Sequence, residues 1–322
     1  MNTIFKYITG ICLLGGMLAS CENDTLPLPK AEIYRTIDKY TVSFTPHVSD
    51  ATSYLWDFGD GSTPSTEMNP VHTYVSFGDY SVKLTVKGDG GEYTTEKVIN
   101  IEALTVIDKL TGGVQALNGK TWVLSRVYNA GKDGAGPVMT EMPIMRPSVD
   151  NVLEMVGLGA EYDNEYTFFF DGRFKANVKN GSALAGLIYG MATQTLNGAY
   201  SEDVGLCQTA YESPAEATFL IKDSELNVVA ILDPTTTETE PPIGNVKFTG
   251  KDWVSLSKGA YFGILDFPTL PIPEIPNPPQ FIIKEISSDK MNVALFMGTY
   301  QYNPNYVALP SMMMHLSFEA KK

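Results

Sequence analysis

The sequence predicts an all-β fold, with one β-sandwich followed by a larger, jelly-roll-like β-sandwich. Short runs of alternating apolar and polar residues recur along the 322 residues and are bounded by turn-forming residues. The chain holds 28 glycines and 20 prolines, with 11% aromatic and only 19% charged residues. This composition suits strands joined by many turns. No helical pattern of convincing length interrupts the runs.

The first predicted sandwich occupies residues 32–103. Its strands alternate with period two, so each has one apolar face. Turn-forming sequences rich in glycine and aspartate separate the strands, which predicts tight connections. The predicted strands are 40–44, 53–58, 80–86 and 96–101.

Three motifs in this block resemble the PKD domain, in the order and spacing of that family. They are Trp56-Asp57-Phe58-Gly59-Asp60-Gly61, Asn69-Pro70-Val71-His72-Thr73-Tyr74 and Gly78-Asp79-Tyr80-Ser81-Val82. The resemblance implies an immunoglobulin-like β-sandwich that serves as a spacer or interaction module without catalysis. We expect Trp56 and Phe58 in its core. Asp57 and Asp60 are expected to cap the turn, with calcium binding as the alternative.

Residues 104–118 are predicted to be a linker, and residues 119–322 the larger sandwich. A hairpin is expected over 165–174, and at most a turn or two of helix over 149–158. Trp122 and Trp253 each lie within a strand pattern and are expected in the core. Further strands are predicted at 119–124, 217–222, 245–249, 253–257, 280–287, 291–296 and 315–319.

This second region also carries recognisable motifs. They are Gly119-Lys120-Thr121-Trp122, Tyr162-Asp163-Asn164-Glu165-Tyr166-Thr167-Phe168 and Asp171-Gly172-Arg173-Phe174. Their arrangement is similar to the C-terminal domains of Bacteroidetes PKD-containing lipoproteins linked to polysaccharide utilisation. The resemblance implies a polysaccharide or oligosaccharide ligand and, as a further partner, an outer-membrane transport complex.

The N-terminus resembles a bacterial lipoprotein signal. A short apolar segment ends in Leu18-Ala19-Ser20-Cys21, and the segment is too short to span a bilayer. The resemblance implies that residues 1–20 are removed, that Cys21 is lipidated, and that residues 21–31 are a tether. Lipid then anchors the protein in the outer membrane. The signal is similar to those of Bacteroidetes lipoproteins, and this resemblance implies that acidic Glu22 and Asp24, just after the cysteine, mark export to the cell surface.

Charge and cysteine content exclude several classes of function. The formal net charge of −14 disfavours nucleic acid and acidic polymers as partners. Cys207 is the lone cysteine of the two domains, so no intramolecular disulfide is expected there. A small buried side chain is the expected role of Cys207. No zinc site or other cofactor is predicted, with calcium as the alternative.

Sugar binding usually requires exposed aromatic rings beside polar groups. Tyr300, Tyr302, Asn303 and Tyr306 cluster in one stretch between two late strands and form the first candidate. Tyr128, before a glycine-rich stretch, is the second. The alternative is that these tyrosines cover the ends of the sandwich.

The run Glu161-Tyr162-Asp163-Asn164-Glu165 concentrates acids. On a strand, its three carboxylates share one face. This resembles the catalytic strand of a jelly-roll glycoside hydrolase family, which implies Glu161 as nucleophile and Glu165 as acid/base. A cation site and a solvated strand face are the alternatives.

The sequence therefore predicts a non-catalytic glycan-binding lipoprotein of the cell surface, with the PKD domain as spacer. A divergent glycoside hydrolase using Glu161 and Glu165, and an adhesin or protein-binding scaffold, are the alternatives.

Overall fold

The computed structural model describes residues 26–270 and 278–322, so Cys21 and the lipoprotein signal lie outside the described residues. The chain divides into two compact units between Ala103 and Leu104. The predicted all-β class is confirmed in both units. Within the described residues, no helix is both long and apolar enough to cross a membrane.

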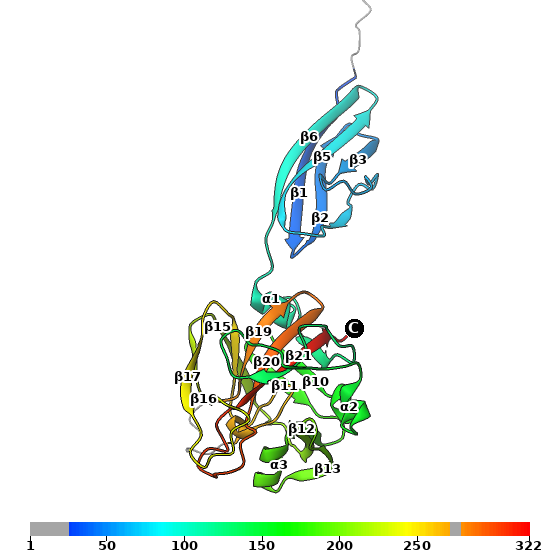
Figure 1. The fold of residues 1–322 in the computed structure, drawn as a ribbon. Helices are drawn as coiled ribbons and strands as arrows, with labels where there is room; N and C mark the ends of the chain where they lie inside the picture. Colours follow the sequence, from blue (N-terminus) through cyan, green and yellow to red (C-terminus); the bar gives the residue numbers. More distant parts are fainter. Residues whose placement is uncertain (1–25, 271–277) are drawn as a thin grey trace, which may run out of the picture. The chain divides into compact units, whose positions relative to one another are not determined.

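The described part of the first unit is a sandwich of two three-stranded antiparallel sheets (Figure 1). Alternate residues of both sheets meet in one core, where Trp56, Phe44 and Val82 are fully covered. One sheet consists of β1 (Lys30–Asp38), β2 (Thr41–Ser49) and β4 (Val71–Thr73). The other consists of β3 (Ser53–Asp57), β5 (Gly78–Gly88) and β6 (Gly91–Ile101).

The turn after β3 has the predicted architecture. Asp57 Oδ1 accepts a hydrogen bond from the Gly59 backbone at 3.0 Å, and Asp60 Oδ1 accepts one from the Ser62 backbone at 3.1 Å. His72 Nε2 lies 2.8 Å from the other Asp60 oxygen. Both aspartates therefore cap the turn with their own carboxylates, as such side chains commonly do.

Eight strands in the described part of the second unit form a closed antiparallel barrel. Each strand pairs with the next one in the barrel, and the last pairs back with the first. The connections are therefore up-and-down and differ from the Greek-key connections expected of a jelly roll. The strands are β7 (Lys120–Leu124), β10 (Glu165–Phe168), β11 (Arg173–Asn177), β15 (Ala217–Lys222), β18 (Trp253–Leu256), β19 (Gln280–Ile286), β20 (Lys290–Met297) and β21 (Met312–Ala320).

Aromatic side chains fill much of this barrel. Phe262, from the connection between β18 and β19, stacks on Phe281 and Phe318 with ring centroids 4.6 and 4.3 Å away. Tyr166 and Phe168 of β10 contact the same ring edge-on. An eight-stranded barrel either is filled by side chains or holds one small ligand, and here aromatic side chains occupy much of the interior.

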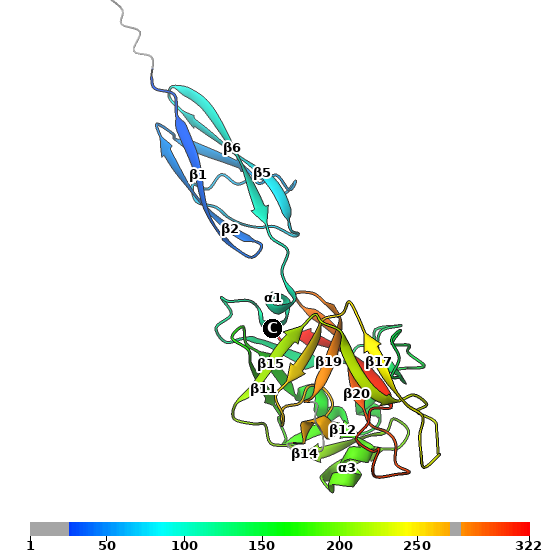
Figure 2. The same ribbon diagram turned by 90° about the vertical axis from the view of Figure 1, so that its left-hand side faces the viewer.

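Insertions between the barrel strands cover its outside and one end. A hairpin of β16 (Leu226–Ile231) and β17 (Ile243–Phe248), yellow in Figure 2, packs on the outer residues Trp253, Ile282 and Ala294. A small sheet of β12 (Ser182–Gly186), β14 (Leu206–Ala210) and β13 (Leu196–Ser201) carries α3 (Leu187–Thr193). The other additions are α1 (Val106–Thr111), β8 (Gly134–Pro137), β9 (Arg146–Pro147), α2 (Val152–Met155), η1 (Gly159–Asp163) and η2 (Phe267–Thr269).

Candidate functional site

A polar hollow of about 300 Å³ lies at the barrel strands β19 to β21. The loop between β7 and β8 borders one side of it, and the turn between β19 and β20 borders another. Its polar lining residues are Ser125, Asn129, Lys132, Glu285, Ser287, Lys290, Asn292, Ser317 and Glu319.

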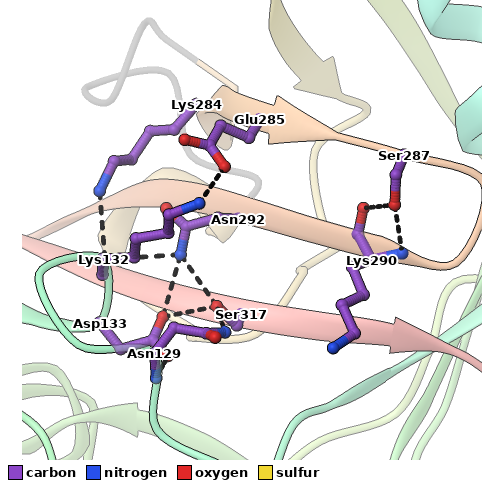
Figure 3. Close-up of polar contacts among 9 residues, drawn as sticks. All are labelled: Asn129, Lys132, Asp133, Lys284, Glu285, Ser287, Lys290, Asn292 and Ser317. Atoms are coloured by element: carbon purple, nitrogen blue, oxygen red, sulfur yellow. Dashed lines mark hydrogen bonds and ion pairs between the residues drawn. The ribbon is translucent and has the colours of Figure 1, made fainter.

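A buried hydrogen-bond network forms the base of this polar hollow (Figure 3). Asp133 accepts from the Ser317 hydroxyl at 2.7 Å, from Asn292 Nδ2 at 2.9 Å and from the Asn129 backbone at 2.8 Å. Asn129 Nδ2 in turn donates to the Ser317 hydroxyl at 2.8 Å. Burial raises the pKa of Asp133, and the hydrogen bonds from Ser317 and Asn129 partly oppose that rise.

The side chain of Asn292 is left with one unused acceptor. Asn292 is 4% exposed, and its Nδ2 donates to Asp133 and to the Ser317 hydroxyl, the latter at 3.0 Å. Its Oδ1 has no hydrogen-bond partner among the residues that the structure describes. An ionised carboxylate only accepts hydrogen bonds, so the Asp133 carboxylate binds the amide nitrogen of Asn292. The amide oxygen of Asn292 therefore points away from Asp133 and has no donor among the described residues. A buried acceptor without a partner costs about 1–3 kcal/mol.

Charged side chains surround the same hollow. Lys132 forms an ion pair with Glu285, and Ser125 donates to Glu319 at 3.0 Å. Beside the network, Lys284 Nζ lies 3.3 Å from His315 Nδ1. Burial, followed by the neighbouring Lys284 charge, lowers the pKa of His315 to about 4. His315 is therefore neutral near pH 7, and Lys284 is the donor in this contact.

The predicted tyrosine cluster lies elsewhere, against the connection between β16 and β17. Tyr300 is 4% exposed, and its hydroxyl donates to the Glu238 carbonyl. Tyr306 donates to Glu240 at 2.5 Å. Tyr302, by contrast, is 47% exposed. The hydroxyls of Tyr300 and Tyr306 thus fasten a connection, and Tyr302 is the member of the cluster with an accessible ring.

The other two residues that the sequence predicts to bind a ligand, Asn303 and Tyr128, lie in different places. Asn303 belongs to the tyrosine cluster and donates from Nδ2 to the Thr239 carbonyl at 3.0 Å. Tyr128 lies at a second, apolar cavity, and its backbone donates to Asp150 Oδ1 at 2.6 Å. The structure therefore does not bring Tyr128 together with the tyrosine cluster, and none of these residues lines the polar hollow.

The expectation that Glu161 and Glu165 share a strand face is wrong. Glu161 lies in the 3₁₀ helix η1, and Glu165 begins β10. Glu161 is 2% exposed and accepts from the Tyr166 hydroxyl, from Asn164 Nδ2 at 2.8 Å and from the Leu184 backbone at 3.0 Å. Burial raises the pKa of Glu161 to about 7. Its carboxyl group is therefore occupied by buried hydrogen bonds in the interior of the second unit.

Glu165 is a structural ion-pair residue. Its carboxylate contacts Lys179 at 3.0 Å and also pairs with Lys321. Burial opposes ionisation of Glu165, but hydrogen bonds from these lysines outweigh it and lower its pKa to about 2. Cys207 is fully buried, and burial raises its pKa to about 11, which fits the expected packing role. No group of three or more metal-ligating side chains is present within the described residues.

Comparison with known proteins identifies the first unit as the predicted PKD domain, with residues 28–103 matching that family. A microbial collagenase of Vibrio alginolyticus is 40% identical over 86 residues, which are 27% of this chain and 10% of the collagenase. Collagenase ColQ1 of Bacillus cereus is 55% identical over 51 residues, 16% of this chain and 5% of the relative. The chain thus spans a tenth or less of these relatives.

The PKD1 domain of Vibrio anguillarum Epp is 35% identical and covers 24% of this chain and 98% of its own, with a TM-score of 0.23.

Sequence reasoning missed the polar hollow because its residues come from three distant segments. Asp133 and Asn292 are separated by 159 positions, and Asp133 and Ser317 by 184. One local signal was present: Asn292 is a polar residue inside the otherwise apolar run from Met291 to Met297. A buried amide in such a run requires partners, which indicates a polar network.

Proposed function

We propose that this chain is a non-catalytic glycan-binding protein that recognises sugar hydroxyls in the polar hollow at Asn292. One observation carries the proposal: Asn292 Oδ1 is a buried acceptor without a partner among the described residues, and Asn292 lines the hollow. A donor from a bound molecule, such as a hydroxyl group, relieves this cost.

The charges around the polar hollow favour a neutral ligand. Lys132 and Lys290 are balanced by Glu285 and Glu319, so the lining has no formal excess of either sign. Such a lining offers both donors and acceptors. Each hydroxyl of a sugar donates one hydrogen bond and accepts others, and therefore matches this mixture.

Apolar side chains complete the lining. Ile286, Met291 and Phe318 border the hollow between the polar groups. Sites that bind small molecules typically combine apolar walls with a few placed polar groups. Met291 and Phe318 are buried, so the C–H face of a sugar ring packs on the half-buried Ile286 while its hydroxyls reach Asn292 and the charged rim.

The positions of the acids support binding without hydrolysis. A glycosidase requires one carboxylic acid that stays protonated and a second, ionised carboxylate near the same bond. Glu161 has the raised pKa, but its oxygens accept from three internal donors and it does not line the hollow. Glu285 and Glu319, which do line it, are engaged by Lys132 and Ser125.

The cellular setting belongs to the same proposal. The motif ending at Cys21 supports lipid anchoring in the outer membrane, facing the cell surface. The PKD domain then acts as the spacer between anchor and glycan site. The motifs of residues 119–322 resemble those of polysaccharide-utilisation lipoproteins. We therefore propose that the protein acts beside an outer-membrane transport complex of such a system.

Affinity electrophoresis of residues 22–322 in gels containing neutral or acidic polysaccharides tests the proposal. We expect a neutral polysaccharide to retard the protein without releasing sugar. Lys290→Ala, at the polar hollow, is expected to weaken retardation, whereas Tyr302→Ala in the tyrosine cluster is not. Loss of retardation only in Tyr302→Ala would move the site to that cluster. Absence of retardation by every glycan would refute glycan binding.

A further inference from the structure

The second unit has a second, apolar cavity of about 190 Å³, which shares only Ser125 and Ser317 with the described lining of the polar hollow. We propose that this cavity binds a small uncharged molecule built on an aromatic ring or short alkyl chain. This site goes beyond the glycan-binding function, and its ligand class follows from the cavity's wall, size and mouth.

The apolar cavity exists because β21 changes partner along its length. Its C-terminal part pairs with β7, over Phe318 to Ala320, and its N-terminal part pairs with β8, over Met312 to His315. Near this change the chain leaves β7 for the loop that leads to β8, and the aromatic packing of the barrel stops. The cavity is lined there by Leu124, Leu153, Leu206, Ile264, Met314 and Leu316.

The buried polar groups in the wall of the apolar cavity already have hydrogen-bond partners within the protein. Asp133 and Ser317 reach the wall, but they hydrogen-bond to each other at 2.7 Å. The Tyr162 hydroxyl, also at the wall, accepts from the Leu153 backbone at 3.4 Å. Among the described residues, none of the buried side-chain atoms without a partner belongs to this wall. A ligand hydroxyl placed here would lose its hydrogen bonds to water, which disfavours sugars.

The size of the apolar cavity suits one ring. An engineered cavity of about 150 Å³ lined by apolar side chains stays dry and binds benzene. The cavity here is somewhat larger, at about 190 Å³. It therefore admits benzene with a short substituent.

The mouth of the apolar cavity is polar and carries both charges. Arg126 pairs with Glu154 at 2.7 Å and lies over the Tyr162 ring, 4.5 Å from its centroid. Arg146 and Asp203 add one charge of each sign. A ligand with an apolar body and a neutral polar end can pack its body against the apolar wall and hydrogen-bond with its polar end at this mouth.

Titration with toluene and 2-phenylethanol tests the site, using thermal unfolding and protein NMR of residues 22–322. We expect both probes to bind saturably and to shift the resonances of Leu153, Met314 and Leu316. Val204→Phe narrows the cavity from a half-buried position and is expected to weaken binding at least tenfold. The matched control is Val98→Phe, an exposed position of the PKD domain.

The outcomes separate this site from the glycan site. Val149→Phe, at an exposed lining position, repeats the test if Val204→Phe does not fold. Lys290→Ala, which lines the polar hollow and not the apolar cavity, is expected to leave toluene binding unchanged. Failure of both probes to bind saturably, or equal binding by Val204→Phe and Val98→Phe, would overturn the proposal. Neither result would bear on retardation by glycans.

Discussion

Asn292 Nδ2 lies 2.9 Å from Asp133 Oδ1, and this contact holds the nitrogen end of the buried amide, which leaves the oxygen end without a partner among the described residues. Asp133 reaches the contact from the loop before β8, and Asn292 from β20. Three donors satisfy the Asp133 carboxylate, so it holds the amide nitrogen firmly. The Asn292 oxygen is therefore preorganised as an acceptor, which reduces the ordering cost of binding a hydroxyl.

Asp133→Asn is expected to weaken both folding and glycan binding. In the variant, an amide NH₂ group replaces one of the two carboxylate oxygens that accept hydrogen bonds. At least one buried donor therefore loses its acceptor. We expect a loss of about 1–3 kcal/mol in the free energy of unfolding, measured by urea denaturation. Asp203→Asn, at an exposed position, serves as the control. Equal stability of the two variants would contradict this role of Asp133.

Glu161→Ala is expected to destabilise the second unit strongly. The change leaves the Tyr166 hydroxyl and the Leu184 backbone without their buried acceptor, whereas the Asn164 amide keeps the Ser182 carbonyl. We expect at least about 2 kcal/mol, since each unsatisfied buried group costs about 1–3 kcal/mol. Urea denaturation compares this variant with Glu165→Ala, which removes ion pairs near the surface. A smaller loss in Glu161→Ala than in Glu165→Ala would refute the structural role.

Glu161 also gives a pH-dependent prediction. The pKa of Glu161 is about 7 in the folded protein, against 4.5 for an unperturbed glutamate, so the folded state holds the proton more tightly. The protonated group contributes fully below pH 4.5, and its contribution is lost as the pH rises through 7. The shift corresponds to about 3 kcal/mol at most. Glu161→Gln is therefore expected to gain stability relative to the native chain between pH 4.5 and 8.

The comparison with Glu161→Gln is needed because other groups titrate in the same range. His315 has a folded pKa of about 4, so its contribution is lost as the pH falls below 6.5. Asp266 has a pKa raised to about 7 by burial and acts in the same direction as Glu161. Thermal unfolding of both proteins across this range isolates Glu161. A constant difference between them would contradict the raised pKa.

Gly59→Ala is expected to destabilise the PKD domain more than Gly61→Ala. Both glycines have positive φ, 77° and 76°, so both substitutions carry the same backbone strain of about 1 kcal/mol. A Cβ at Gly59 meets the Ser81 carbonyl oxygen at 2.5 Å, whereas one at Gly61 meets nothing within 4 Å. Thermal unfolding of the first unit is expected to show the larger loss for Gly59→Ala. The reverse order would contradict the close approach.

The sequence predicted best where local chemistry decides the structure. The PKD turn follows from Asp57, Gly59 and Asp60, whose capping bonds span two residues each. The strand at 217–222 also matches β15, because a period-two pattern is read within a single segment.

The long-range features were not readable in the same way. Glu161 begins an acid-rich run that suggests a strand. Its buried position is stabilised instead by hydrogen bonds from Tyr166 and from the Leu184 backbone. The closing of the barrel depends on β21 pairing with β7, nearly two hundred positions away. The same applies to Asn292, whose partners come from another strand and a distant loop. Such contacts are decided by tertiary packing.

Isothermal titration calorimetry of Asn292→Leu tests the central claim most directly. The titrant is an oligosaccharide from the polysaccharide that retards the native chain. Leucine keeps the size of the side chain but offers no acceptor, so we predict at least fivefold weaker binding, equivalent to about 1 kcal/mol. Thermal unfolding of the variant verifies that it is folded. Unchanged affinity in a folded Asn292→Leu protein would contradict glycan recognition in this hollow.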